Sequence, residues 1–83
     1  MTNFSNHALA RLKRRGIEVD AATRQRLGAG VSRAAAKGSR DAVVLVDDKA
    51  FVVAVPNRTV ITAVDRAHMR EHVFTNIDSA ALG

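Results

Sequence analysis

The segment DAVVLVDDKAFVVAVPNRTVITAVD, residues 41–65, decides the fold of this chain. It contains three apolar runs rich in valine, which are separated by short polar segments. β-Branched residues favour strands, whereas aspartate, asparagine and proline favour turns. The pattern therefore predicts strands over 42–46, 50–55 and 59–64, and turns over 47–49 and 56–58. Short turns between successive strands make an antiparallel meander.

A first helix is expected near the N-terminus. Ser5 is a favourable N-cap, and Gly16 follows Arg15 as the expected C′ residue. Phe4 and Leu9 occupy the two positions of a hydrophobic staple. The buried stripe of this helix is predicted to consist of Ala8, Leu9 and Leu12.

A second helix is expected to begin after Asp20, another favourable N-cap, and to end at Gly38. Gly28 and Gly30 each cost a helix about 1 kcal/mol relative to alanine. They predict either a close approach of another backbone or a break in the helix. Helical spacing assigns four apolar residues to the core: Leu27, Val31, Ala34 and Ala35.

The C-terminal part predicts a short closing unit. Asp65 is placed to cap a helical turn over 66–71, and residues 73–77 are expected as a fourth strand or as an extended tail on the sheet. The whole chain, residues 1–83, is therefore predicted to be a single α+β domain. Its two N-terminal helices are expected to pack on a small antiparallel sheet of three to four strands.

Composition restricts the classes of function. The chain contains no cysteine, which excludes disulfides and thiolate metal sites. Its formal net charge is +5. Residues 11–40 contain most of the basic side chains but only two acids, Glu18 and Asp20. This asymmetry predicts an acidic partner, namely nucleic acid, an anionic membrane surface or an acidic protein.

The N-terminus has no basic region followed by an apolar run, and no stretch of about 20 apolar residues is present. A signal peptide and a membrane span are therefore not expected. The predicted location is the cytoplasm.

A basic surface is the first candidate site. His7, Arg11 and Arg14 are spaced i, i+4 and i+7, so they share one face of the first helix. Arginine binds phosphate oxygens bidentately, and histidine transfers protons near neutral pH. The full set of candidate binding residues is His7, Arg11, Arg14, Arg15, Arg24 and Arg26. The alternative is a solvated helix face whose arginines form salt bridges.

This surface does not predict a catalytic residue. A nuclease also needs a base and a group that stabilises charge, and the predicted strands offer almost no titratable side chains. Metal and cofactor sites are not predicted either. Asp47 and Asp48 are expected to form a turn, and His68 and His72 lack a third ligand nearby.

A docking edge is the second candidate site. Phe74 and Ile77 are expected to be apolar anchors within a polar stretch. Such a stretch is suited to docking a partner, and it is equally suited to closing the sheet. The candidate residues are Asn57, Arg58, Phe74, Thr75, Asn76 and Asp78.

Several blocks of the chain resemble a family of small proteins encoded in bacterial flagellar operons, near the genes for the hook cap and hook. The most specific blocks are NRTVITAV, residues 57–64, and FTNIDS, residues 74–79. Further matches are Phe4, Ser5, His7, Ala8, Arg11, Leu12, Arg15, Gly16, Ile17, Ala35, Lys37, Gly38, Ser39, Asp47 and residues 50–53. The opening block also resembles small RNA-cleaving toxin domains that place a helix pair on a sheet.

The resemblance implies a role in making the flagellum, at the hook or rod stage. We therefore expect a non-enzymatic accessory protein that binds flagellar proteins. The alternatives to a cytoplasmic location are association with the basal body and export through it without a cleaved signal. An RNA-binding regulator or a weak ribonuclease is the alternative. The exposed edges of a small sheet also leave room for a homodimer.

Overall fold

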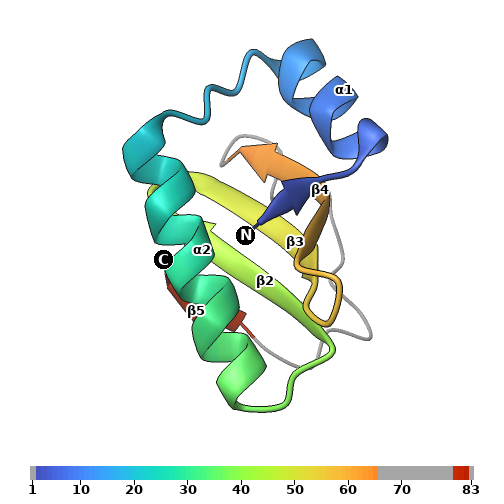
Figure 1. Cartoon of the computed structure of the whole chain (residues 1–83). Coiled ribbons are helices and arrows are strands. Elements are labelled where there is room, and N and C mark those ends of the chain that lie inside the picture. Colours follow the sequence, from blue (N-terminus) through green and yellow to red (C-terminus); the bar gives the residue numbers. More distant parts are fainter. Residues whose placement is uncertain (1, 66–79, 83) are drawn as a thin grey trace.

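The protein, seen here in a computed structural model that describes residues 2–65 and 80–82, has two helices on one face of a mixed sheet (Figure 1). The elements are β1 (Asn3–Phe4), α1 (Asn6–Arg15), α2 (Ala21–Ala36), β2 (Asp41–Val46), β3 (Lys49–Ala54), β4 (Thr59–Asp65) and β5 (Ala80–Leu82). The five strands lie in the order β1-β4-β3-β2-β5. The predicted α+β class is confirmed, and β2, β3 and β4 form the predicted antiparallel meander.

Two short edge strands, which the sequence patterns did not indicate, make the sheet mixed rather than purely antiparallel. β1 pairs in parallel with β4, and β5 pairs in parallel with β2. Both are too short to show a period-two pattern of their own. The turn expected over 66–71 and the strand expected over 73–77 lie outside the described residues.

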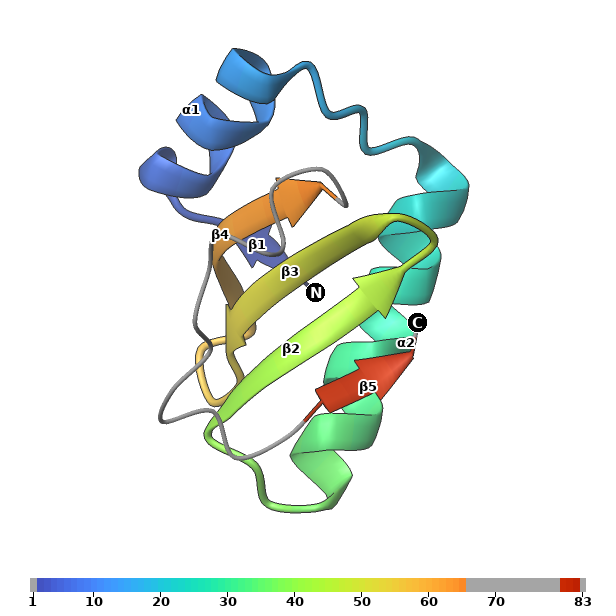
Figure 2. The same cartoon turned by 180° about the vertical axis from the view of Figure 1, so that it is seen from behind.

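The main core lies between the sheet and the helices. Alternate residues of β2 and β3 point toward the helices, and Phe51 is the largest fully buried side chain among the described residues. The cluster consists of Ala8, Leu12, Leu27, Val31, Val44, Val46, Phe51, Val53, Val60 and Ala63. On the opposite face, seen in Figure 2, the buried residues are Val43, Ala50 and Val64.

One predicted core residue is on the surface. Leu9 was assigned to the buried stripe of α1, but it is 51% exposed. Ala8 and Leu12, one helical turn apart, face the sheet, and the rotation of about 100° per residue carries Leu9 away from it. Phe4 instead contacts Phe51, with the two rings edge to face and their centroids 6.4 Å apart.

Both predicted N-caps are confirmed. Ser5 Oγ accepts a hydrogen bond from the Ala8 N–H at 3.0 Å, and Asp20 Oδ1 accepts one from the Thr23 N–H at 2.8 Å. The bond from the Thr23 backbone lowers the pKa of Asp20 below its ordinary value of 3.8. At the other end of α1, Gly16 has φ +64, a left-handed conformation that glycine adopts without strain.

A β-bulge in β4 anchors the start of α1. Val52 lies opposite Thr62, whereas Val53 lies opposite Val60, so Ile61 is the extra residue in β4. The Ile61 carbonyl accepts a hydrogen bond from Ser5 Oγ at 3.1 Å. The same hydroxyl therefore caps α1 and ties it to a strand 56 residues away along the chain.

We expect Ser5→Ala to lower the free energy of unfolding by about 1 kcal/mol, because it removes the cap and the bond to the bulge together. Urea denaturation monitored by circular dichroism measures the change. Ser5→Thr, which keeps the hydroxyl, should lose less than half as much. Equal losses in the two variants would show that the hydroxyl is not the stabilising group.

The helix α2 is continuous through both of its interior glycines. Gly30 is buried, and a Cβ added there would lie 2.5 Å from Val44 Cγ1. Gly30 therefore allows a close approach to the Val44 side chain of β2, rather than to another backbone as the sequence predicted. Neither helix in the described part of the chain has the length and hydropathy needed to span a membrane.

Candidate functional site

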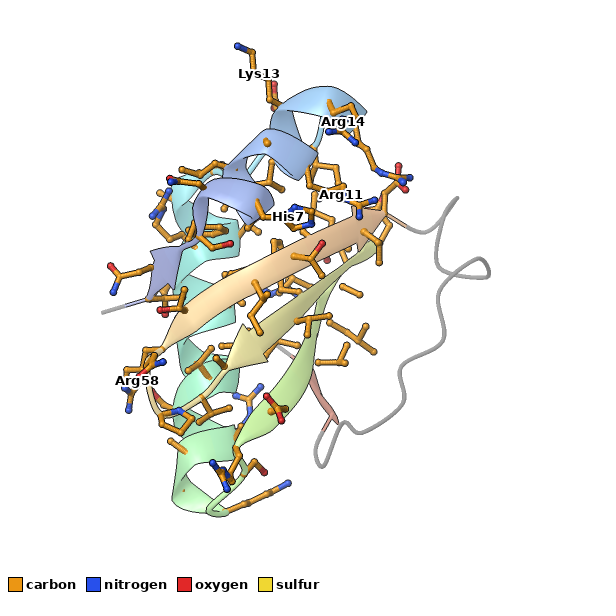
Figure 3. All side chains as sticks on the ribbon, turned by 90° about the vertical axis from the view of Figure 1, so that its right-hand side faces the viewer. His7, Arg11, Lys13, Arg14 and Arg58 are labelled. Carbon is orange, nitrogen blue, oxygen red and sulfur yellow. The ribbon has the colours of Figure 1, made fainter. Side chains whose placement is uncertain are left out.

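The helix α1 presents the predicted basic residues along its outer side. Figure 3 shows His7, Arg11 and Arg14 along α1, near the C-terminal half of β4. His7 and Arg14 are exposed, and Arg11 is half-buried. Within residues 2–65 and 80–82, none of these three side chains forms an ion pair. Within the described part of the chain, Arg11 and Arg14 are thus cations without an ionic partner, and they could bind an anion.

Arg15 lies apart from this surface. Its side chain is half-buried, and its Nε and Nη1 atoms are enclosed with no hydrogen-bond partner in the described part of the chain. It lines a hollow of about 310 Å³ together with Gly16, Ile17, Glu18, Asp48, Lys49 and Asp65. The hollow contains carboxylates as well as cations, so it is not a purely basic site.

The two candidate arginines of α2, Arg24 and Arg26, are also separated from α1 and from each other. Arg26 Nη1 donates to Asp47 Oδ1 at 2.9 Å, which fastens the turn between β2 and β3 to the helix. The two side chains are 46% and 62% exposed, and pairs as exposed as this contribute at most about 1 kcal/mol. The Arg26–Asp47 pair is therefore an exposed contact between α2 and the turn, whereas Arg24 contacts a different residue, Phe4.

Arg24 lies over the ring of Phe4, with its guanidinium carbon 5.2 Å from the ring centroid. This geometry is a cation–π contact. Arg24 also lines a groove of about 420 Å³ between α2 and the edge of the sheet. The lining residues are Thr2, Arg24, Gln25, Gly28, Ser32 and Arg58, and we call this feature the Arg24–Arg58 groove.

Arg58 reaches the groove from the turn between β3 and β4. Its Nη1 donates to Ser32 Oγ at 3.3 Å. Its carbonyl accepts a hydrogen bond from the Asn3 N–H at 2.8 Å, so the parallel pairing of β1 with β4 sets the position of this turn. Sequence reasoning assigned Arg24 and Arg58 to two different sites. Both line the same groove because α2 lies beside the β3–β4 turn, a long-range contact that no sequence pattern indicates.

The predicted docking edge is only partly described. Asn57 is exposed and lines a separate hollow with Arg40, Asp41, Ala54 and Pro56. Arg58 faces the Arg24–Arg58 groove instead. The other four candidates lie outside the described residues: Phe74, Thr75, Asn76 and Asp78.

The acidic turn has a structural role. Asp47 pairs with Arg26, and Asp48 Oδ1 accepts from Lys49 Nζ at 3.2 Å. Asp47 also has φ +56, a left-handed conformation that aspartate tolerates better than most residues. In the described part of the chain, no group of three metal-ligating side chains comes together. His68 and His72 lie outside it.

Comparison with known proteins gives one family match. No curated protein and no solved structure matches the chain. The family model described as "Putative flagellar" matches residues 59–82. This segment begins with β4 and ends with β5. Over these residues, the chain is similar to a family of flagellar proteins.

Proposed function

We propose that this protein is a non-enzymatic accessory factor of bacterial flagellum assembly that acts at the hook or rod stage by binding other flagellar proteins. The observation that carries the proposal is the family match over residues 59–82. The matched segment includes β4, which pairs with β1 and β3 and anchors α1 through its bulge. The matched segment therefore includes the strand that contacts β1, β3 and the start of α1.

The distribution of polar groups supports binding rather than catalysis. A general base must be held close to the proton it removes and to groups that stabilise the developing charge. His7 is exposed on α1, and its arginine neighbours lie on the same helix. Among the described residues, Ser5 and Asp20 cap the two helices, and Arg26 pairs with Asp47, so these polar side chains have structural contacts. Binding requires only an accessible surface, and α1 provides one.

A clean deletion of the gene in a motile bacterium tests the proposal. We expect missing or misshapen hooks by electron microscopy and a loss of swimming in soft agar. The wild-type gene supplied in trans should restore both. Affinity purification of the tagged protein from motile cells should recover flagellar components, and cells that lack the flagellar genes provide the matched background. Intact flagella with normal swimming would overturn the proposal.

RNA binding is a second candidate because Arg11 and Arg14 form no ion pair in the described part of the chain. If about four phosphates of a single strand are neutralised, the slope of log affinity against log salt is about −3. Arg11→Gln combined with Arg14→Gln should reduce this slope by about one unit or more. Absence of RNA binding even at low salt would remove this candidate.

A further inference from the structure

The Arg24–Arg58 groove differs from the basic face of α1 because elements distant in sequence build it. Arg24, Gly28 and Ser32 are four residues apart in succession, so they form one stripe along α2. Arg58 approaches this stripe from the β3–β4 turn, and Thr2 approaches it from the start of the chain. Figure 3 shows that Arg58 lies at the opposite end of the molecule from Arg11 and Arg14. The groove is thus a separate surface.

Both arginines of the groove are oriented by neutral partners. Arg24 rests on the Phe4 ring, and Arg58 donates one hydrogen bond to the Ser32 hydroxyl. Neither forms an ion pair within residues 2–65 and 80–82. A guanidinium carries five N–H donors in a planar fork, so most of these donors stay available. Orientation by a ring and a hydroxyl reduces the conformational entropy that binding must remove.

The described lining of the groove contains no acidic residue to compete for these donors. Thr2 and Ser32 add hydroxyl groups, and Gln25 adds an amide. Gly28 leaves space between α2 and Thr2, because its missing Cβ would lie 3.7 Å from Thr2 Oγ1. The guanidinium groups of Arg24 and Arg58, with the open space beside Gly28, favour a ligand with several anionic oxygen atoms. Carboxylate groups fit this geometry, since arginine binds them through paired hydrogen bonds.

The groove is poorly suited to single-stranded RNA. Proteins that bind single strands stack bases on aromatic rings. Phe4 is the aromatic residue next to the groove, but Arg24 covers its face and Phe51 packs against it edge to face. A base therefore finds no free ring among the described residues there, whereas a carboxylate needs only the two guanidinium groups.

We infer that the Arg24–Arg58 groove binds an acidic segment of a partner protein, with glutamate or aspartate carboxylates held by Arg24 and Arg58. The inference rests on the proposed function and names the chemistry of the partner. It assigns recognition to a surface formed by α2 and the β3–β4 turn rather than to α1.

The test uses the full chain, labelled with ¹⁵N, and a blocked octapeptide of alternating glutamate and serine. We expect the side-chain Nε–H signals of Arg24 and Arg58 to shift on titration, together with the backbone amides of Gly28 and Ser32. A peptide with glutamine in place of glutamate should cause no such shift. Shifts confined to Arg11 and Arg14 would overturn the inference, since they would place binding on α1.

Substitutions measure the contribution of each arginine. Arg24→Gln and Arg58→Asn should each weaken binding about fivefold, and together about 25-fold if they act independently. Asparagine suits position 58 because this residue has φ +49. Arg33→Gln, at an exposed position of α2 away from the groove lining, removes the same charge and should change affinity less than about twofold. Equal effects of all three substitutions would show non-specific attraction and overturn the inference.

Gly28→Ala separates binding from folding. The added methyl group meets Thr2 Oγ1 at an ordinary contact distance, so it should fit without strain. Alanine favours the helix, so the midpoint of thermal unfolding should rise. The added methyl group also narrows the groove beside Arg24 and should therefore weaken peptide binding. Unchanged peptide affinity in this variant, together with the raised midpoint, would contradict the assigned site.

Two outcomes distinguish this inference from the proposed function. If the gene deletion impairs flagella but the Arg24→Gln, Arg58→Asn double variant restores them fully, the groove assignment fails and the flagellar role stands. If the deletion leaves flagella intact, the flagellar role fails whatever the peptide does. Binding of a uridine hexamer at the groove with the affinity of the acidic peptide would overturn the choice of a protein partner.

Discussion

We expect Phe51→Ala to lower the free energy of unfolding by about 4 kcal/mol, the largest effect of any single truncation in the main core. Phe51 is fully buried in the central strand β3, and it contacts Phe4 edge to face at 6.4 Å. Truncation leaves a cavity in the centre of the cluster between the sheet and the two helices. A chain of this size has a total stability of about 4–12 kcal/mol, so the variant should be largely unfolded or close to it.

Chemical denaturation of the wild type and the variant, followed by far-ultraviolet circular dichroism, measures this change. Phe51→Leu is the matched control, since it keeps most of the apolar volume and should cost about 1 kcal/mol. Because Phe4 contacts both Phe51 and Arg24, Phe51→Leu should also alter the position of Arg24 in the Arg24–Arg58 groove. A loss below about 2 kcal/mol for Phe51→Ala would show that this core is less tightly packed than the structure indicates.

Gly30→Ala should lower the free energy of unfolding by about 2 kcal/mol, although alanine is the better helix former. A Cβ at this position would lie 2.5 Å from Val44 Cγ1, closer than two carbon atoms can approach. Val44 is fully buried and branched at Cβ, so it has little freedom to turn away. The helix α2 must therefore move away from β2, and packing along the whole contact is weakened.

The neighbouring glycine provides the control for this prediction. Gly28→Ala makes the same chemical change two residues earlier in the same helix, where the nearest atom is Thr2 Oγ1 at 3.7 Å. It should stabilise the protein by about 0.5–1 kcal/mol. Opposite signs at the two glycines would identify the contact with β2 as the cause. If both substitutions stabilise the protein, α2 does not lie as close to β2 as described.

The family match and the Arg24–Arg58 groove are connected through one strand. The matched segment starts at Thr59, directly after Arg58, and the pairing of β1 with β4 positions both the turn and the start of α1. A change in β4 that shifts this pairing would alter the groove and the basic face of α1 together. For this reason, surface substitutions such as Arg24→Gln are better probes of function than substitutions within β4.

The local parts of this fold were readable from the sequence. Strands β2, β3 and β4 carry dense valine runs between turn-forming residues, and the bounds predicted from these runs agree with the structure within a residue or two. The caps at Ser5 and Asp20 were equally clear, because a side-chain oxygen there reaches a backbone N–H only three residues later. Such contacts depend on short sequence separation, and residue type alone therefore indicates them.

Contacts between residues that are distant in the sequence could be identified only from the tertiary structure. The bulge at Ile61, the exposure of Leu9 and the contact of Gly30 with Val44 all depend on how an element is rotated against its neighbour. The candidate groove depends on this as well, since α2 supplies Arg24 and the β3–β4 turn supplies Arg58. By itself the sequence determined the α+β class, the meander and the basic character of the helices, because these follow from local propensity and composition. Only the tertiary structure decided which cations share a surface, because long-range packing sets the register and orientation of each element.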